Sequence, residues 1–182
     1  IKAINQMKTK RIDCIKLNNT VYASIAGIGF DALIAREFAK TKTRGFQPYL
    51  KLVLQNYPQY KPQNYTLVID DIEINTQALF VSFSNSNQFG FDVEIANNAS
   101  LCDGLIDVVI VQKPPLPLLF WTAQLLFWRK FDNSIYVNAY QAKKVTVKSN
   151  NPTGVNLDGE YAEFDTDLTF EIMPDSLNGI IP

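Results

Sequence analysis

Two predicted turns contain acidic residues that could act in catalysis or metal binding. The first turn follows Ser100. Asp103 and Asp107 bracket Gly104 in a turn that leads into a strongly apolar run. An aspartate beside backbone carbonyls freed by a turn can hold Mg²⁺ or Ca²⁺, with water completing the coordination shell. Asp-Gly is also a common turn dipeptide, so spacing alone favours an ordinary turn over a metal site.

The second acidic turn is Asp158-Gly159-Glu160, which lies between two segments predicted as strands. One carboxylate could orient or deprotonate a nucleophilic hydroxyl, while the other acts through a metal-bound water. That arrangement suits phosphoryl transfer. A tight Asp-Gly hairpin has the same local sequence, so the pattern by itself also fits a purely structural turn.

Composition narrows the remaining chemistry. The 182 residues include no histidine, which excludes Ser-His-Asp and Cys-His catalysis, His-ligated zinc or haem, and any imidazole acid or base. The two cysteines, Cys14 and Cys102, stand apart with no CxxC motif, so neither a disulfide framework nor a thiolate metal site is indicated. With no signal-peptide pattern in the sequence, we expect a cytoplasmic protein.

The charges are balanced in number but not in distribution. A formal net charge of −1 argues against a general nucleic-acid-binding protein. Residues 1–64 hold 11 Lys and Arg and 3 Asp and Glu, whereas the other 118 residues hold 6 and 15. Either the two signs interleave on the folded surface, or the basic part, including Lys40, Lys42 and Arg44, faces phosphate or the anionic inner surface of the membrane.

Strands dominate the predicted secondary structure after the first third of the chain, because β-branched and aromatic residues recur with a period of two. Two helices are predicted before them, over 31–44 with Asp31 as the cap, and over 49–57. No repeat, linker or low-complexity run divides the chain, so we expect one domain over 1–182. The predicted strands cover 12–17, 21–26, 65–69, 72–75, 78–84, 105–111, 142–148, 154–157, 161–164 and 168–173.

A third helix is predicted over the most apolar stretch, Leu116–Trp128. Its 13 residues are too few for a transmembrane helix, which needs about 20. The stretch fits a core helix that covers the sheets. It also fits a helix that lines a lipid cleft or contacts a membrane, through the side chains Phe120, Trp121, Leu125 and Trp128.

The glycines of Gly27-Ile28-Gly29 join a predicted strand to a predicted helix, where a helix N-terminus would favour an anion. The segment lacks the third glycine of GxGxxG and the Gly-Lys-Ser/Thr of a P-loop. We therefore predict a structural tight turn here rather than a phosphate-binding loop.

Three segments occur in an order that is itself informative: AGIGFDALIA at Ala26–Ala35, the run Asn85–Val111, and NLDGEY at Asn156–Tyr161. Together they make the chain resemble, over essentially its whole length, the C-terminal domain of the bacterial diacylglycerol kinase family, which includes sphingosine kinases and related lipid kinases. The resemblance implies a mostly β (α+β) fold. This fold is an antiparallel β-sandwich of two sheets with two or three covering helices.

The resemblance also implies an activity: ATP-dependent phosphorylation of a lipid hydroxyl, diacylglycerol-like, with Mg²⁺ as cofactor. In the family, ATP binds an N-terminal domain with a Gly-Gly-Asp-Gly-Thr motif, which is absent from these residues. The chain is therefore expected to be the lipid-side domain of a two-domain kinase and inactive alone. By family analogy Asp158 is the general base and Glu160 helps to place magnesium, while Ser100, Asp103 and Leu105 form a structural magnesium site.

Two alternatives stay open at this point. A non-catalytic lipid-binding or interaction module would keep the fold without the chemistry, and departures from the family pattern between Phe89 and Cys102 motivate it. The related fold of the NAD kinases would use a nucleotide acceptor. The long apolar stretch at Leu116–Trp128 favours a lipid acceptor over a nucleotide acceptor.

Overall fold

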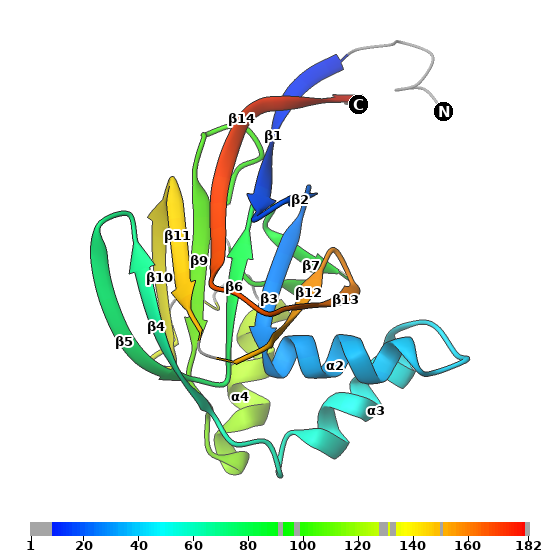
Figure 1. The fold of residues 1–182 in the computed structure, drawn as a ribbon. Helices are drawn as coiled ribbons and strands as arrows, with labels where there is room; N and C mark the ends of the chain where they lie inside the picture. The colour runs from blue at the N-terminus through cyan, green and yellow to red at the C-terminus, as the bar shows by residue number, and fades with distance from the viewer. Residues whose placement is uncertain are drawn as a thin grey trace.

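The computed structural model describes residues 9–90, 93–96, 99–127, 131, 134–149 and 151–180. Within them the chain forms two six-stranded sheets, and every strand pairing is antiparallel. Three helices gather in the lower part of the view in Figure 1, beside one end of the sheets. The predicted two-sheet, mostly β architecture with two or three covering helices is confirmed.

The first sheet brings the two ends of the described chain together. Its long strand β14 pairs with β1 along nearly all of β1, and β11 and β4 continue the sheet on the other side of β14. The strand order is β2-β1-β14-β11-β4-β5. The bounds are β1 Thr9–Leu17, β2 Thr20–Tyr22, β4 Gln63–Ile69, β5 Ile72–Ala78, β11 Lys144–Lys148 and β14 Leu168–Ile180.

The second sheet holds both predicted acidic turns at the ends of its strands. Its central strands β6 and β9 are buried along most of their length, which is why they read as near-continuous apolar runs. The strand order is β10-β9-β6-β3-β12-β13, and β7 and β8 form a separate pair. The bounds are β3 Ile25–Gly29, β6 Phe80–Ser84, β7 Gln88–Gly90, β8 Val93–Glu94, β9 Ile106–Val111, β10 Val137–Ala142, β12 Thr153–Leu157 and β13 Glu160–Phe164.

The helices are α2 (Phe30–Ala39), α3 (Phe46–Asn56) and α4 (Leu116–Phe127). Helix α2 packs against the second sheet at β3, β6, β12 and β13, and α3 packs against α2. Among the described residues no helix is long and apolar enough to cross a bilayer.

The start of α2 differs from the sequence prediction. Gly29 is the N-cap, with a left-handed φ of 85°, and no side chain caps the helix. The prediction that Asp31 caps it is wrong, because Asp31 lies inside the first turn and its side chain is buried. The Phe30 N–H is satisfied instead by the Leu79 carbonyl at 3.0 Å, so packing of the strand-to-helix junction replaces a side-chain cap.

The predicted strand 142–148 corresponds to β11, and the strand before it, β10, was not predicted. β10 ends at Ala142 in the second sheet, and β11 begins at Lys144 in the first. The Asp70 carboxylate accepts hydrogen bonds from the Lys143 and Lys144 N–H groups, both at 2.9 Å, and so fixes the corner where the chain changes sheets.

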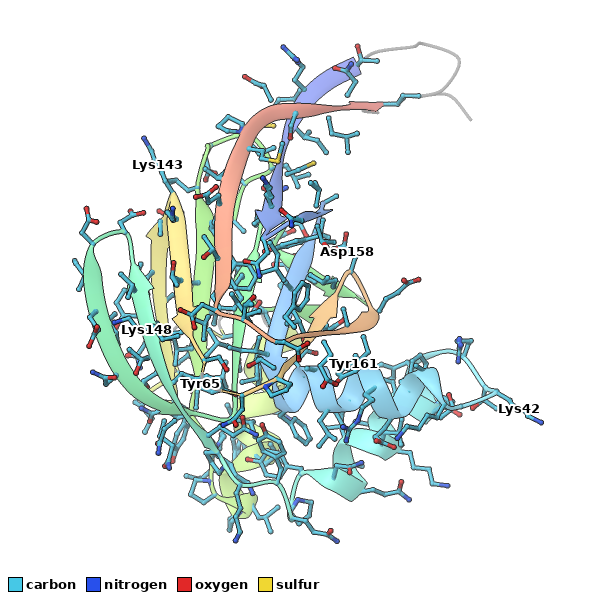
Figure 2. The ribbon with its side chains drawn as sticks, in the orientation of Figure 1. Lys42, Tyr65, Lys143, Lys148, Asp158 and Tyr161 are labelled. Carbon is cyan, nitrogen blue, oxygen red and sulfur yellow. The ribbon has the colours of Figure 1, made fainter. Side chains whose placement is uncertain are left out.

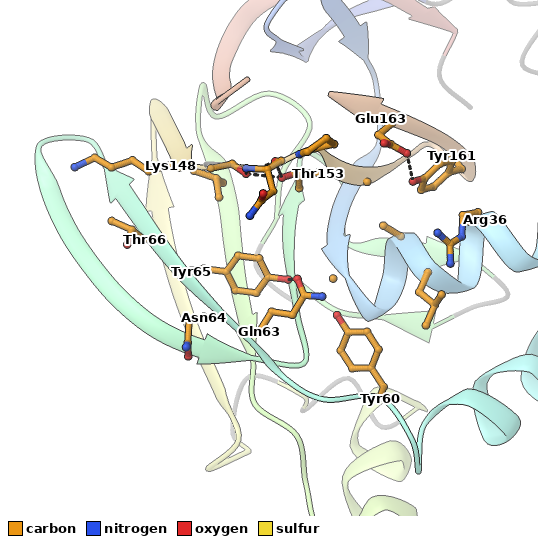
Figure 3. A pocket seen from close by; sticks show the side chains of 18 residues that line it. Arg36, Tyr60, Gln63, Asn64, Tyr65, Thr66, Lys148, Thr153, Tyr161 and Glu163 are labelled. Carbon is orange, nitrogen blue, oxygen red and sulfur yellow. Dashed lines mark hydrogen bonds between the residues drawn. The ribbon is translucent and has the colours of Figure 1, made fainter. Parts of the chain in front are cut away.

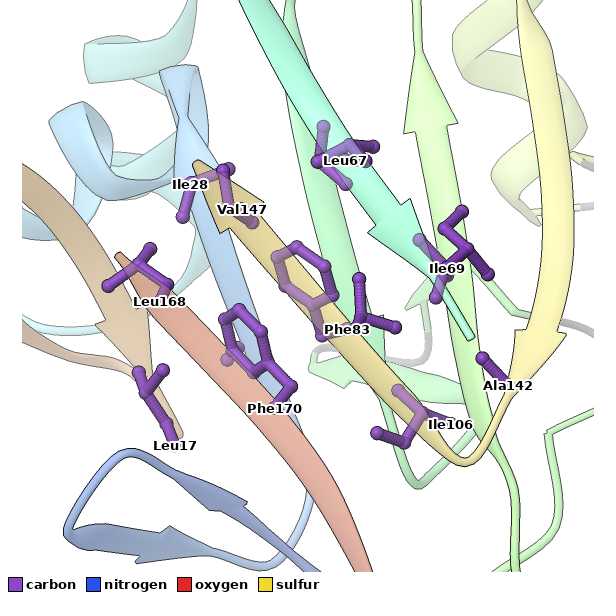
Figure 4. Packing of buried hydrophobic residues seen from close by; sticks show 14 of the residues in the cluster. Leu17, Ile28, Leu67, Ile69, Phe83, Ile106, Ala142, Val147, Leu168 and Phe170 are labelled. Atoms are coloured by element: carbon purple, nitrogen blue, oxygen red, sulfur yellow. The ribbon is translucent and has the colours of Figure 1, made fainter. Parts of the chain in front are cut away.

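The main core lies between the two sheets. Phe83 of β6 and Phe170 of β14 stack across it with ring centroids 3.8 Å apart and planes 16° from parallel (Figure 4). Both side chains are fully buried and belong to a cluster that draws residues from both sheets. This contact between sheets is the packing that makes the fold a sandwich.

Truncating one ring of the stacked pair should destabilise the whole domain. Phe83→Ala is expected to lower the free energy of unfolding by about 3–5 kcal/mol, because it leaves a cavity between the sheets. Ile72→Ala, at a side chain that is 68% exposed on the same fold, should change it by less than about 0.5 kcal/mol. Urea unfolding curves measure both, and equal effects would contradict the assignment of the core.

Candidate functional site

The second acidic turn forms the tight β12–β13 hairpin that its sequence predicted. Asp158 and Gly159 have left-handed φ values of 48° and 95°, the backbone that a two-residue hairpin loop requires. The Asp158 N–H also donates to the Ile25 carbonyl at 2.9 Å. The turn is therefore bonded to the start of β3 as well as within its own hairpin.

The Asp158 carboxylate is held by three backbone donors. Its Oδ2 accepts the Ala23 N–H at 3.0 Å, and its Oδ1 accepts the N–H groups of Ser24 and Ile25 at 3.0 and 2.9 Å. Successive backbone N–H groups that converge in this way form a cradle for negative charge. The carboxylate is thus oriented by the backbone before any ligand binds.

Asp70 provides a comparison for this arrangement. It also has a left-handed φ, of 38°, and its carboxylate likewise clamps two backbone N–H groups of a neighbouring segment, those of Lys143 and Lys144. The Asp70 N–H donates to the Lys144 carbonyl at 2.9 Å, as that of Asp158 does to Ile25. A carboxylate clamp is therefore a structural device of this fold, and Asp158 differs from Asp70 in what it faces.

Asp158 lines the rim of a cavity of about 780 Å³ that lies between the helices and the second sheet. A cavity of this size is in the range that binds ligands of several hundred daltons. In Figure 2 Asp158 lies at the tip of its hairpin, above α2 in the view. The apolar wall comes mainly from α2, α3 and α4 and includes Ile34, Phe38, Leu50, Val53 and Leu119.

Two sets of hydrogen bonds lie at the polar end of the cavity. The Asn156 Nδ2 donates to Asp31 Oδ2 at 2.9 Å, and the Asn156 Oδ1 accepts the Gly159 N–H at 3.0 Å. On the other side of the turn, Ser24 and Ser86 share a hydroxyl–hydroxyl hydrogen bond of 2.6 Å. All of these residues line the cavity, so an apolar chamber ends in a compact set of polar groups.

Asp31 is the functional candidate that sequence reasoning missed. It is 4% exposed, and burial raises the pKa of its carboxyl to about 7, an effect that the Asn156 hydrogen bond partly offsets. A Cβ at Gly27 would come within 1.9 Å of Asp31 Oδ2. The glycine four positions earlier on β3 is therefore the sequence signal for this buried carboxyl, and it was interpreted only as a turn residue.

The Ser100–Leu105 turn is held in place by a second residue that sequence reasoning missed, Asp13. Its two carboxylate oxygens accept the N–H groups of Gly104 and Asp175, both at 2.8 Å. Within the turn, the Leu105 N–H donates to Asp103 Oδ1 at 3.1 Å. Gly104 has a left-handed φ of 70°, which glycine adopts without strain.

The donors for a cation at this turn are few. Asp103 is exposed, and because its Oδ1 accepts the Leu105 N–H, its Oδ2 is the oxygen that could bind a cation. The backbone carbonyls of Ser100 and Leu105 are the further donors that the family resemblance implies. In the part of the chain that the structure describes, no three acidic or cysteine side chains converge. One carboxylate with carbonyls and water is a donor set that suits Mg²⁺, so the magnesium prediction remains a prediction.

None of the other predicted site residues on the β12–β13 hairpin and α4 is among the described residues that line the cavity. Glu160 is exposed at the first position of β13 and is not a lining residue. Trp121 is 63% exposed on α4, and among the described side chains of this helix Leu119 and Thr122 line the cavity. The side chains of Phe120 and Leu125, and the whole of Trp128, lie outside the described part of the chain.

A second cavity, of about 620 Å³, lies on the opposite flank of α2 (Figure 3). Ala32, Leu33 and Arg36 face it from α2, whereas Asp31 and Ile34 face the first cavity. Its other side chains are mostly polar, and they include Tyr65, Gln63, Thr153, Tyr161 and Glu163. The first cavity is thus the one with an apolar chamber.

Comparison with known proteins agrees with this geometry. The family model described as the YegS C-terminal NAD kinase beta sandwich-like domain matches residues 24–181. The chain belongs to this family. The match covers all of the second sheet, the three helices and both acidic turns of the YegS C-terminal domain described here.

The relatives carry lipid-kinase names. A "putative lipid kinase" of Staphylococcus haemolyticus is 24% identical over 97% of this chain and 59% of its own length, and a diacylglycerol kinase of Bacillus subtilis is 24% identical over 82% and 50%. A Bacillus anthracis crystal structure described as a "putative diacylglycerol kinase" superposes with a TM-score of 0.75 at 20% identity, over all of this chain and 60% of that one. The chain thus spans about half to three fifths of the proteins it matches.

The buried carboxyl of Asp31 makes the stability of this domain depend on pH. Because the folded-state pKa of about 7 lies above the usual value of 3.8, this group favours the folded state below pH 4, and that contribution is lost as the pH rises through 7. The unfolding free energy of the wild type relative to Asp31→Asn should therefore fall by about 4 kcal/mol between pH 4 and pH 8. Urea unfolding of both proteins measures it, and a difference that is constant across this range would contradict the burial of an ionisable Asp31.

Proposed function

We propose that this chain is the acceptor-side domain of a kinase that transfers the γ-phosphoryl group of ATP to the hydroxyl of a diacylglycerol-like lipid. One observation carries the proposal: the Asp158 carboxylate, oriented by three backbone N–H groups, lies at the polar rim of a large apolar cavity. An acyl chain suits the apolar wall, and a head hydroxyl then lies at the rim. Family membership and the names of the relatives support the same reaction class.

In the proposed reaction Asp158 is the general base. Its Oδ1 accepts two backbone hydrogen bonds and its Oδ2 only one, so Oδ2 is the oxygen that takes the proton of the lipid hydroxyl. The oxygen of the lipid hydroxyl attacks the γ-phosphorus as it loses its proton, and the bond between the γ-phosphorus and ADP breaks. ADP stays bound to the nucleotide-binding domain, which the proposal requires as a partner. Magnesium, when bound, neutralises phosphate charge; Glu160 would help to place it, and Ser100, Asp103 and Leu105 would hold a structural ion.

A membrane surface is the proposed source of the lipid. Phe46 and Leu50 of α3 both line the cavity and are exposed, so the cavity reaches the surface at this helix. Leu54 of α3 and Leu118 and Trp121 of α4 are further exposed apolar side chains on the two helices. The basic loop between α2 and α3 lies next to this apolar face, which is the combination that peripheral membrane proteins use.

A second candidate function is lipid binding without catalysis. The observation that favours it is that this chain supplies both the apolar wall of the cavity and the polar groups at its end. A longer protein that binds lipid alcohols but transfers no phosphate from ATP to them would select this function over the kinase.

Asp158→Asn in the protein that carries this chain should lower kcat for phosphorylation of a lipid alcohol by about 10²–10⁴-fold. Asparagine cannot accept all three backbone hydrogen bonds, so the variant should also lose about 1–3 kcal/mol of stability. Transfer from γ-labelled ATP and thermal unfolding are measured together.

Asp70→Asn is the matched control for that experiment, because it loosens the same kind of clamp on the other sheet. It should lose comparable stability and keep kcat within about twofold. If both variants lose activity in proportion to their stability, Asp158 is a structural residue and the general-base assignment is wrong.

Neutralising the basic loop should weaken membrane binding. The triple variant Lys40→Gln, Lys42→Gln, Arg44→Gln is expected to reduce affinity for vesicles with 30 mol% anionic lipid by at least about tenfold, since each cation near such a surface contributes roughly 1 kcal/mol. In Figure 2, Lys143 and Lys148 lie on the opposite side of the molecule from Lys42, and Lys144 follows Lys143 in the chain. The variant Lys143→Gln, Lys144→Gln, Lys148→Gln removes equal charge and should bind nearly as the wild type does. Equal losses in the two triples, measured by vesicle sedimentation, would contradict a directed membrane face.

A further inference from the structure

The backbone segment that holds Asp158 is itself held by one buried side chain, that of Asn85. Asn85 follows β6 and is fully buried. Its Nδ2 donates to the Ala23 carbonyl at 2.8 Å and to the Asp13 carbonyl at 2.7 Å. The side chain therefore ties β1 of the first sheet to the segment that enters β3 of the second.

The amide of Asn85 can take only one orientation. Both of its partners are carbonyl groups, which cannot donate, so the amino group must face them and Oδ1 must face away. Oδ1 is buried and has no hydrogen-bond partner among the described residues. A buried acceptor without a partner is rare, because it costs free energy. What Asn85 gives the fold in return is the clamp that its amino group places on two carbonyls.

That clamp acts on the peptide groups that donate to Asp158. The Ala23 carbonyl accepts Asn85 Nδ2, and the N–H of the same peptide group donates to Asp158 Oδ1 at 3.0 Å. The Ser24 carbonyl accepts the backbone N–H of Asn85 at 2.9 Å, and the Ile25 N–H of that peptide group donates to the same carboxylate oxygen at 2.9 Å. Hydrogen bonds in such a chain polarise and strengthen one another. Both donors to Oδ1 are thus fixed in direction through residue 85.

We infer that Asn85 is a positioning residue for Asp158. It holds the two peptide groups that fix Oδ1, and so it leaves Oδ2 as the oxygen that meets the lipid hydroxyl. Asn85 does not line the cavity, so its effect on the reaction passes through the Ala23–Ile25 segment rather than through contact with the lipid. The inference rests on the proposed function for the role of Asp158 as general base.

Hydrogen exchange of this chain, followed by NMR, tests the clamp without an activity assay. Asn85→Ala should raise the exchange rates of the Ser24 and Ile25 amides by at least about tenfold, because it removes the donor to the Ala23 carbonyl and loosens the segment. Asn85→Leu removes the same donor but keeps the volume filled, so it should have the same effect even if Asn85→Ala folds poorly.

Asp70→Asn is the matched control for hydrogen exchange, because it loosens a backbone clamp at Lys143 and Lys144 instead. It should leave the exchange rates of the Ser24 and Ile25 amides within about twofold of the wild type. A general loss of stability would raise exchange at this segment in all three variants.

A double-mutant cycle in the longer protein that carries this chain separates positioning from a merely structural role. Asn85→Leu should lower kcat for phosphorylation of a lipid alcohol by about 10–100-fold and change KM by less than about threefold. Added to Asp158→Asn, the same substitution should lower kcat by no more than about twofold further, since Asn85 acts only through Asp158. A structural effect would instead multiply with that of Asp158→Asn.

The outcomes distinguish this inference from the proposed function. Ser24 and Ile25 amides that are unprotected in the wild type, unchanged in both Asn85 variants, or equally affected by Asp70→Asn overturn the clamp. Losses in kcat that multiply in the double variant overturn the positioning role. If exchange behaves as expected but the longer protein phosphorylates no lipid alcohol, the hold of Asn85 on the Asp158 cradle stands and the kinase proposal fails.

Discussion

The hydrogen bonds between the Asp158 carboxylate and three successive backbone N–H groups are the contact on which the rest of the site depends. They fasten the β12–β13 hairpin to the segment that enters β3, and β3 runs directly into α2. The same strand therefore positions the hairpin at one end and the helix at the other. Residues of both elements, among them Asp158 of the hairpin and Asp31 of α2, line the cavity.

Two glycines make that geometry possible. Gly29 starts α2 with a left-handed φ, and a Cβ there would meet the Tyr65 hydroxyl and the Leu79 carbonyl at 2.6 and 2.8 Å. Gly27 leaves room for the carboxyl of Asp31. Gly27, Ile28 and Gly29 are the last residues of β3, which runs directly into α2, so the prediction of a tight turn is wrong. The packing around these glycines places a buried carboxyl in the wall of the cavity.

Local patterns predicted the features that short segments determine. The Asn156–Tyr161 hairpin, the meander of β4 and β5 and the apolar helix α4 follow from turn residues and periodicity within a few positions. The resemblance to bacterial diacylglycerol kinases predicted the sandwich, and family membership confirms that relationship. The corner between β10 and β11 could not be predicted, because it depends on a carboxylate 73 residues away.

The same limit explains why the role of Asp31 was missed. Its partner Asn156 is 125 residues away in sequence, and nothing within α2 distinguishes a capping aspartate from a buried one. Asp13 was missed for a similar reason, since it bonds residues 91 and 162 positions away. Contacts between residues so far apart in sequence form only in the folded sheets, so the local sequence pattern does not predict them.

Photocrosslinking with a 1,2-diol that carries a diazirine near the end of its ten-carbon chain tests the central claim most directly. If the lipid lies in the large cavity with its head at Asp158, the label should map to side chains of the apolar wall on α2 and α3, such as Phe38, Leu50 and Val53. Excess unlabelled diol should suppress it. Labelling at Tyr60, Tyr65 or Thr153 in the polar cavity, or labelling spread over the exposed surface, would contradict the account.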